Sequence, residues 1–282
     1  MIREWVNAPR ENRELRTRLA GVRKQRARLR KRLERCTAAL ERARRELDGM
    51  REFTLEVFPH VAMPDEVCRV LAGVREERLT HLTEPQLTSL VSCVLEAEVS
   101  GREGLVIEAG TALGGSAIAM AAAKSPERPM LVYDVFGVIP PPGEEDGAAG
   151  QERYAEIAAG RSPGLEGDVY YGYREDLLGE VTASFARHGV PVDENRVELV
   201  QGLFQDTIRV DEPVALAHVD ADWYESTLTC LTRIAPHLVP GGRIVIDDYW
   251  FWSGCRTAVE EYVADHPELR VERRAKIHLV RR

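Results

Sequence analysis

Long apolar runs, paired cysteines and zinc-type ligand sets are all absent from this sequence of 282 residues. The longest uncharged apolar stretch, 109–123, is shorter than the roughly 20 residues that a membrane-spanning helix needs. The N-terminus has basic residues but no continuous apolar segment behind them, so we expect no secretory signal. The five cysteines never form a CxxC pair, which fits reduced thiols. We therefore expect a cytoplasmic protein that does not contact a membrane.

Proline and glycine are scarce in residues 11–50, which contain no Pro and two Gly among many Arg, Leu, Glu and Ala. This composition predicts a long helix. Its apolar residues recur on two seven-residue tracks offset by four, which is the seam of a left-handed coiled coil of about five heptads. One track holds Leu15, Val22, Leu29, Cys36, Ala43 and Met50, and the other holds Leu19, Leu33, Leu40 and Leu47, with Arg26 in the remaining place. We expect a coiled-coil arm, 1–51, that joins copies of the chain into a homo-oligomer, followed by a separate domain, 52–282.

Acidic residues are scarce only in this arm. Residues 1–51 contain 17 basic and 7 acidic residues, which gives a net charge of +10. Residues 52–282 contain 21 basic and 39 acidic residues, which gives −18, and the two sum to the net charge of −8. A basic stripe could contact nucleic-acid phosphates. No base-reading motif follows, however, and the rest of the chain is strongly acidic, so we expect no nucleic-acid partner. The basic run fits a solvated helix face, with docking on an acidic surface as the alternative.

The second part of the chain alternates short apolar runs with helical stretches. A capping box at Thr83 and Gln86 predicts a helix over 84–99. The apolar runs are typical of buried parallel strands, and their alternation with helices predicts an α/β fold with a doubly wound, mostly parallel sheet. The final segment, 276–282, fits an antiparallel edge strand. The five predicted parallel strands are 105–109, 130–135, 197–200, 214–220 and 243–248.

A glycine-rich turn follows the first predicted strand. Its glycines, at Gly110, Gly114 and Gly115, form GxxxGG rather than GxGxxG, and no Gly-Lys-Ser/Thr follows as in a P-loop. Small residues allow a ligand to approach the backbone, and the helix that begins near Ser116 offers free N–H groups. The turn is therefore a candidate nucleotide site, with a purely structural role in helix packing as the alternative.

Two acids near this turn favour S-adenosylmethionine over NAD as the cofactor. Asp134 ends the second predicted strand, 24 residues beyond Gly110, where a carboxylate can accept hydrogen bonds from both hydroxyls of a ribose. Glu108 precedes the glycines, where it would repel a pyrophosphate but suit a ligand with an amino group and a sulfonium.

Carboxylates cluster where the fourth and fifth predicted strands end. Neighbouring parallel strands lie about 4.8 Å apart, so adjacent strands would bring Asp220, Asp247 and Asp248 within reach of one ion. A hard divalent cation, with Mg²⁺ the best match, would offset their repulsion and activate a hydroxyl for methyl transfer. Asp222 is the candidate general base, with its side chain on the same face as Asp220 if the strand pattern continues. The alternative is structural, with a helix cap and an Asp–Arg pair; His218 fits a core histidine better than a catalyst.

Together these motifs resemble those of the macrocin-type sugar O-methyltransferases, magnesium- and S-adenosylmethionine-dependent enzymes that modify deoxysugars of macrolide and aminocoumarin antibiotics. The resemblance covers roughly residues 80–280. It rests on five motifs in order: Glu108-x-Gly110 with Gly114-Gly115; Asp134-x-Phe136-Gly137 followed by Pro140; Gly202-x-Phe204-x-Asp206-Thr207; Asp220-x-Asp222-x-Tyr224-Glu225-Ser226-Thr227; and Gly241-Gly242 leading to Asp247-Asp248-Tyr249.

The resemblance implies a class I methyltransferase fold and a role for each matched residue. Asp220, Asp247 and Asp248 match the metal ligands, and Asp222 matches the proposed base. The matched cofactor contacts are Glu108, Gly110, Gly114, Ser116, Asp134 and, beside the adenine, Gly202 and Phe204. The segment 137–156 corresponds to a substrate loop, and its Pro and Gly content suggests a mobile lid with few packing contacts.

The expected reaction is methyl transfer from S-adenosylmethionine to a sugar hydroxyl of a small glycosylated molecule. A rival function keeps the fold but methylates a catechol or another phenol. Low aromatic content near the substrate loop favours a polar sugar, although Tyr170, Tyr171 and Tyr173 weaken that inference. An NAD-dependent oxidoreductase is a rival of a different class, which the GxxxGG pattern and Glu108 disfavour. A third rival is a non-catalytic assembly protein built on the coiled coil.

Overall fold

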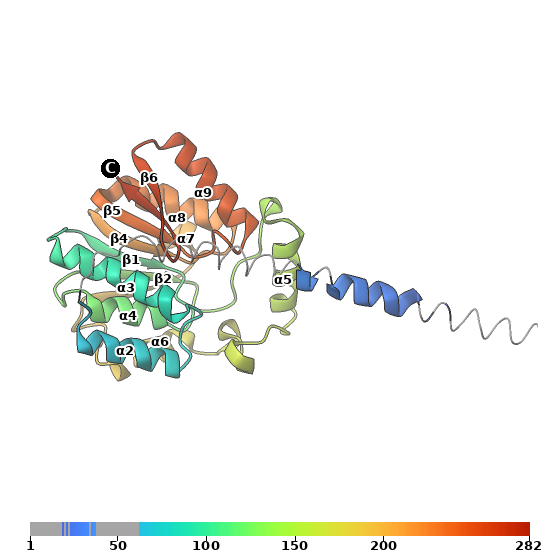
Figure 1. Ribbon diagram of the computed structural model, residues 1–282. Coiled ribbons are helices and arrows are strands. Elements are labelled where there is room, and N and C mark those ends of the chain that lie inside the picture. The colour runs from blue at the N-terminus through green and yellow to red at the C-terminus, as the bar shows by residue number, and fades with distance from the viewer. Residues whose placement is uncertain (1–18, 20, 22, 34, 38–61) are drawn as a thin grey trace, which may run out of the picture. The chain divides into compact units, whose positions relative to one another are not determined.

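The computed structural model describes residues 19, 21, 23–33, 35–37 and 62–282 (Figure 1). The chain divides into two units, Met1–Asp48 and Gly49–Arg282. We describe each unit by itself.

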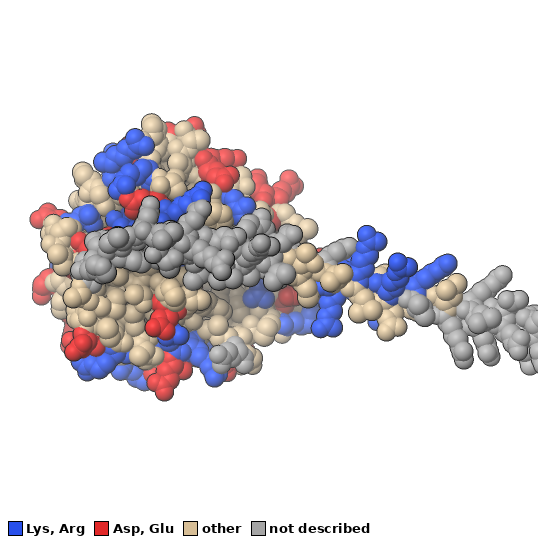
Figure 2. Space-filling view, viewed as in Figure 1, with Lys and Arg blue, Asp and Glu red and all other residues tan. Residues whose placement is uncertain are grey.

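The described residues of the first unit are helical, as expected. Leu19, Leu29 and Leu33 are between 50% and 67% exposed, so the described part of the apolar seam faces outward. Figure 2 shows basic side chains along this part. Cys36 and Arg26 of the seam are exposed too, whereas the remaining seam residues and the predicted boundary at residue 51 lie outside the described residues. Pairing of the seam stays a prediction.

The second unit is built on a seven-stranded sheet with the order β3-β2-β1-β4-β5-β7-β6. Strands β1 to β5 are parallel, and β7 is antiparallel to its neighbours β5 and β6. The strands are β1 Leu105–Ala109, β2 Met130–Asp134, β3 Val197–Gln201, β4 Val214–Val219, β5 Leu238–Ile246, β6 Leu269–Arg273 and β7 Ile277–Arg281. The strand order reverses between β1 and β4, which places a ligand crevice outside the carboxyl ends of these two strands.

The predicted α/β class and all five parallel strands are confirmed. The last strand is antiparallel, as expected, but it is not the edge itself, because β6 pairs along its outer side. The sequence did not predict β6, since only Leu269 of its five residues is buried and the rest carry charge or face solvent. The strand β5 also begins five residues earlier than expected, across a register shift against β4.

Helices cover both faces of the sheet (Figure 1). Successive side chains of β1 point to opposite faces, so Val106 joins one hydrophobic core and Ile107 the other. The first core packs against α2 Asp65–Glu76, α3 Glu84–Val99, α4 Gly115–Ala123 and α6 Leu177–Arg187. The second packs against α8 Tyr224–Ile234 and α9 Ser253–Asp265.

The helix predicted over 84–99 is α3, with the predicted ends. The side-chain oxygen of Gln86 accepts hydrogen bonds from the backbone N–H of Thr83 (2.9 Å) and from its hydroxyl (2.8 Å). This contact fixes the first turn of the helix. Within the described residues, no helix combines the length and apolar character needed to cross a membrane.

Candidate active site

A pocket that is partly open to solvent lies at the carboxyl ends of β1, β2 and β4. Five of the residues singled out from the sequence line it: Gly110, Asp134, Phe204, Asp220 and Asp222. The other six, Glu108, Gly114, Ser116, Gly202, Asp247 and Asp248, lie around it and do not line it. Tyr171 and Trp223 supply aromatic walls that the motifs did not assign.

The glycines of the turn after β1 are required by the packing of the chain itself. Gly110 has a φ of +89°, and a Cβ there would lie 1.9 Å from the backbone oxygen of Asp220. Gly114 has a φ of +86° at the N-cap of α4, and a Cβ would lie 2.9 Å from Val181. Both backbone conformations favour glycine. Gly110 thereby allows the ends of β1 and β4 to meet at the pocket.

Two further cofactor candidates have local roles that the structure makes clear. Gly202 has a φ of +147°, and a Cβ there would lie 2.6 Å from the Thr207 side chain, which belongs to the short helix α7, Phe204–Thr207. Ser116 is buried in the first turn of α4. Both residues shape the backbone beside the pocket.

Asp134 organises the glycine turn. Its Oδ2 accepts hydrogen bonds from the backbone N–H groups of Thr111 (2.7 Å) and Ala112 (3.0 Å), and its Oδ1 accepts from Phe136 (2.7 Å). Burial raises the pKa of Asp134, and these hydrogen bonds partly offset the rise. A carboxylate has about four acceptor sites, so one remains for a donor in the pocket.

Glu108 is fully buried and does not line the pocket. Its Oε2 accepts a hydrogen bond from the Thr111 hydroxyl (2.6 Å), and its Oε1 lies 2.8 Å from His218 Nδ1. The other ring nitrogen of His218, Nε2, lies 3.5 Å from Asp247 Oδ1. Burial alone would lower the pKa of His218, but Asp247 and Glu108 outweigh it and raise this pKa to about 9. No motif indicates this contact, which depends on the pairing of β1 with β4.

The structure brings Asp220, Asp247 and Asp248 together, with one carboxylate oxygen of each within 4.8 Å of the others. Burial and the charges of Asp248 and Asp247 raise the pKa of Asp220 well above its ordinary value. Burial and the charge of Asp247 likewise raise the pKa of Asp248 to about 6. The three carboxylates would therefore repel one another if all were ionised at once.

Lys276 supplies a counter-charge that no motif in the sequence indicates. Its ammonium lies 3.1 Å from Asp247 Oδ2 and donates to the Asp247 carbonyl oxygen at 3.0 Å. Burial would raise the pKa of Asp247, but Lys276 and His218 hold it well below its usual range. The sequence does not indicate this contact, because Lys276 lies 29 residues beyond Asp247, in the turn before the antiparallel strand β7.

The cluster fits a hard divalent cation. Asp247 Oδ1 is buried and, among the described residues, has no hydrogen-bond partner. All three candidate ligands are carboxylate oxygens, which Mg²⁺ prefers. Within the described part of the chain, Asp220 and Asp248 form no ion pair with a lysine or arginine, so a cation would offset their repulsion.

Asp222 is held at the wall of the pocket in a strained backbone conformation. The strand β4 ends at Val219, and Asp222 has a φ of +56°, so the expected continuation of the strand pattern is wrong. Its N–H donates to Asp248 Oδ2 (2.9 Å), and its Oδ1 accepts from the Trp252 indole (2.7 Å). Burial and the charge of Asp248 raise the pKa of Asp222 to about 8. Strain of this kind is common at functional sites.

The segment 137–156 contains regular structure and a buried anchor. It contains a 3₁₀ turn, Glu144–Asp146, and most of α5, Gly147–Ala158. Asp146 is buried and accepts hydrogen bonds from the N–H groups of Tyr224 (2.8 Å) and Gly143 (2.9 Å). This buried carboxylate ties the segment to the start of α8, while only Asp146 and Gly150 of the segment are buried and its other residues are exposed or half-buried.

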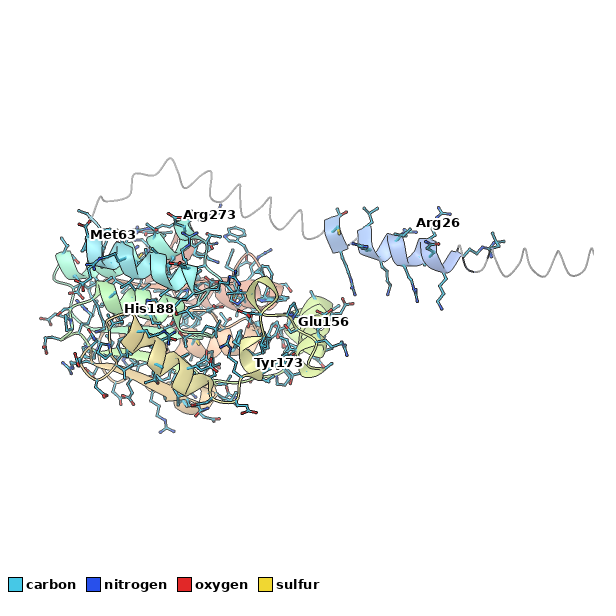
Figure 3. All side chains as sticks on the ribbon, turned by 90° about the horizontal axis from the view of Figure 1, so that it is seen from below. Arg26, Met63, Glu156, Tyr173, His188 and Arg273 are labelled. Carbon is cyan, nitrogen blue, oxygen red and sulfur yellow. The ribbon has the colours of Figure 1, made fainter. Side chains whose placement is uncertain are left out.

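Two aromatic side chains add to this attachment. The indole N–H of Trp223 donates to the Pro140 carbonyl (2.9 Å). The hydroxyl of Tyr173 donates to the carbonyl of Ile157 in α5 (2.6 Å), and Figure 3 shows Tyr173 beside the helix that carries Glu156. Ile139 and Pro140 of the segment line the pocket.

The sheet order, the glycine turn after β1, and the acid that ends β2 define a class I methyltransferase, which uses S-adenosylmethionine. The solved structure of the O-methyltransferase NovP aligns with a TM-score of 0.62 and 27% identity, over 77% of this chain and 97% of that one. The calicheamicin methyltransferase CalS11 shares the fold, with a TM-score of 0.52 and 21% identity over 82% of this chain and 96% of that one.

Sequence comparison identifies the family. Residues 74–270 match the family model described as Macrocin-O-methyltransferase (TylF). One relative is 8-demethyl-8-(2,3-dimethoxy-alpha-L-rhamnosyl)-tetracenomycin-C 4'-O-methyltransferase of Streptomyces olivaceus, with 31% identity over 75% of this chain and 78% of that protein. Another is mycinamicin III 3''-O-methyltransferase of Micromonospora griseorubida, with 31% identity over 66% of this chain and 71% of that protein. The chain belongs to the macrocin O-methyltransferase family and is an S-adenosylmethionine-dependent O-methyltransferase, which confirms the resemblance seen in its motifs.

Proposed function

We propose that this enzyme methylates a sugar hydroxyl on a small glycosylated natural product and depends on Mg²⁺. The observation that carries the proposal is the three-carboxylate cluster of Asp220, Asp247 and Asp248 beside the pocket-lining carboxylate of Asp222. The names of two relatives describe methylation of a rhamnosyl tetracenomycin and of mycinamicin III, which supports a deoxysugar acceptor in antibiotic biosynthesis.

The proposed cofactor site extends from the glycine turn to α7. Gly110, Asp134 and Phe204 line the pocket and are placed to contact S-adenosylmethionine directly. Glu108, Gly114, Ser116 and Gly202 belong to the same site and shape its backbone. Asp134, with one acceptor position left, is suited to a ribose hydroxyl.

In the proposed mechanism, Asp220, Asp247 and Asp248 would hold the cation, which when bound supplies Lewis-acid activation of an acceptor hydroxyl. Asp222 accepts the proton of that hydroxyl. The hydroxyl oxygen bonds to the methyl carbon as the bond between this carbon and the sulfonium sulfur breaks, and the sulfur leaves as a neutral thioether. Trp252 orients the Asp222 carboxylate through its indole N–H. The walls formed by Tyr171 and Trp223 exclude water and hold the acceptor near the methyl group.

A phenolic acceptor is the second candidate, because Tyr171, Phe204 and Trp223 give the pocket aromatic surface that also suits a flat ring. The two candidates separate in one experiment. Methyl transfer from labelled S-adenosylmethionine is measured with a panel of glycosides and a panel of catechols, each with Mg²⁺ and with EDTA. Turnover of glycosides that EDTA abolishes supports the proposal, whereas turnover of catechols alone, or activity that survives EDTA, contradicts it.

We also propose that the arm joins copies of the chain through its apolar seam. The described leucines Leu19, Leu29 and Leu33 are exposed on one helix at coiled-coil spacing. Exposed leucines at this spacing gain stability when they pack against a second helix.

A further inference from the structure

His218 lies between the two halves of the proposed site. In the sheet it stands opposite Glu108 of β1 on one side and Val245 of β5 on the other. Asp247 follows two residues after Val245, and its N–H donates to the Val219 carbonyl (2.9 Å). One imidazole therefore faces Glu108 with Nδ1 at 2.8 Å and Asp247 with Nε2 at 3.5 Å.

Two of these three side chains are closed to solvent. Glu108 is 0% and His218 1% exposed, whereas the side chain of Asp247 is 15% exposed. Neither His218 Nε2 nor Asp247 Oδ1 has a hydrogen-bond partner among the described residues, and the two atoms lie 3.5 Å apart. Both ring nitrogens thus face carboxylate oxygens, which suits an imidazole that donates from both.

The contacts at the Nδ1 end lead to the cofactor turn. Glu108 accepts the hydroxyl of Thr111 (2.6 Å), and the N–H of Thr111 donates to Asp134 (2.7 Å), which lines the pocket. The contact at the Nε2 end leads to the metal cluster through Asp247. The two ends serve different ligands.

We propose that His218 is a positioning residue that orients the cofactor turn through Nδ1 and the metal ligand Asp247 through Nε2, so that each nitrogen sets the affinity for one ligand. This role of His218 rests on the proposed function. Partners that orient a metal ligand typically change metal affinity 10- to 100-fold.

A buried histidine elsewhere in the sheet supplies a matched control. His278 in β7 is also 0% exposed; its Nδ1 lies 3.9 Å from Cys93 Sγ and 3.4 Å from Arg243, and in the described part of the chain it forms no ion pair with a carboxylate. Val245 separates His278 from His218 in the sheet, so His278→Gln removes a buried imidazole that acts on His218 through charge alone.

The test uses substitutions that keep one nitrogen at a time. The amide nitrogen of Asn lies near the place of Nδ1, and that of Gln lies near the place of Nε2. In the full-length protein, isothermal titration measures S-adenosylhomocysteine without metal and MgCl₂ alone, with the melting temperature recorded for each variant. We expect His218→Asn to weaken Mg²⁺ about 10-fold or more and keep S-adenosylhomocysteine affinity within about 3-fold, and His218→Gln to do the reverse. His278→Gln should leave both affinities within about 3-fold of wild type.

Equal losses of both ligands in the two variants, or no loss in either, would overturn the proposed role. If neither variant folds, Thr111→Val takes their place, because it removes the hydroxyl at the end of the Nδ1 contacts. This variant should weaken only the binding of S-adenosylhomocysteine. An equal effect on the binding of both ligands, or no effect, again overturns the proposed role of His218. Wild-type protein that binds neither ligand would refute the proposed function instead. Wild-type binding of both ligands without the crossed pattern refutes only the role of His218.

Discussion

The indole N–H of Trp252 donates a hydrogen bond to Asp222 Oδ1 over 2.7 Å, from a residue 30 positions further along the chain. Asp222 is fixed from its other side by its own N–H, which donates to Asp248. The proposed base therefore has its backbone anchored on the metal cluster and its carboxylate aimed by an aromatic ring. This double attachment explains how a residue with a φ of +56° keeps one conformation.

Trp252→Phe should slow the chemical step and spare cofactor binding. The change removes the donor to Asp222 and keeps an aromatic ring. A hydrogen bond to a charged group contributes about 1.5–3 kcal/mol, so we expect kcat to fall about 10- to 100-fold. Initial rates at saturating substrates give kcat, and titration with S-adenosylhomocysteine checks the cofactor site.

The matched control is Trp250→Phe, two residues away. The Trp250 ring packs on Tyr249 and Arg256 and makes no hydrogen bond with Asp222. We expect its kcat to stay near wild type. An equal loss in both variants would mean that the segment tolerates no change and that Trp252 has no particular role.

Asp220→Asn should stabilise the metal-free protein and abolish its response to Mg²⁺. The substitution removes one of the carboxylates that repel each other in the cluster. A gain of about 1 kcal/mol raises the melting temperature of a domain of this size by about 2–4 °C. Thermal denaturation with EDTA and with MgCl₂ measures both effects.

The control for this change is Asp211→Asn, an exposed aspartate outside the cluster. Its melting temperature should match wild type in EDTA and rise with Mg²⁺ as wild type does. A wild-type melting temperature that does not respond to Mg²⁺, or an Asp220→Asn variant that still responds, would count against the metal site.

Much of this site could be predicted because it follows the edge of a parallel sheet. Apolar runs locate the strands, and the polar residues that end them, such as Asp134 and Asp220, must then meet at one edge. Lys276 and Trp252 escaped prediction, since the first reaches the cluster from an antiparallel strand turn and the second from a loop. The meeting of Glu108 with His218 depends on register, which local sequence does not specify.

Composition did not reveal the anchor of the segment 137–156. Its Pro and Gly residues are typical of mobile loops, and one buried carboxylate, Asp146, ties it to the start of α8. A single Asp among several acids gives no signal of this kind in the sequence.

Asp146→Ala should loosen that segment and weaken acceptor binding. The change removes the acceptor for the N–H groups of Tyr224 and Gly143. We expect the acceptor KM to rise several-fold, S-adenosylhomocysteine affinity to stay the same, and proteolysis within 137–156 to become faster. The control is Glu144→Ala, an exposed acid of the same turn. Unchanged KM and proteolysis in Asp146→Ala would show that the carboxylate does not hold the wall of the pocket.

The arm prediction concerns exposed leucines. Leu29→Asn with Leu33→Asn removes two apolar seam residues that are 58% and 67% exposed, whereas Arg28→Asn with Arg32→Asn changes the same helix outside the seam. Light scattering of the full chain should show a smaller species for the leucine pair only. A wild-type monomer, or the same mass for both pairs, would refute the proposed self-association.

His278 should make the protein sensitive to mild acid. Burial holds the pKa of His278 well below 6.5, and the positive charges of Arg243, Arg274 and His218 lower it further. Two other polar residues face His278: Cys93, with its Sγ 3.9 Å from Nδ1, and Glu272, which lies opposite His278 in the neighbouring strand β6. The two arginines are themselves paired with Glu96 of α3. As the pH falls below 6.5, the unfolded chain binds a proton on this histidine and the folded chain does not, so the free energy of unfolding decreases, by up to about 1.4 kcal/mol per pH unit.

Urea denaturation at pH 7.5, 6.5 and 5.5 tests this effect against His278→Gln. The substitution removes the titrating group, so the stability of wild type relative to the variant should fall steadily below pH 6.5 and stay constant above it. The direction follows from a lowered pKa, because a raised one would make wild type gain stability in acid. Parallel pH profiles for the two proteins would mean that His278 takes up a proton in the folded state as readily as in the unfolded chain.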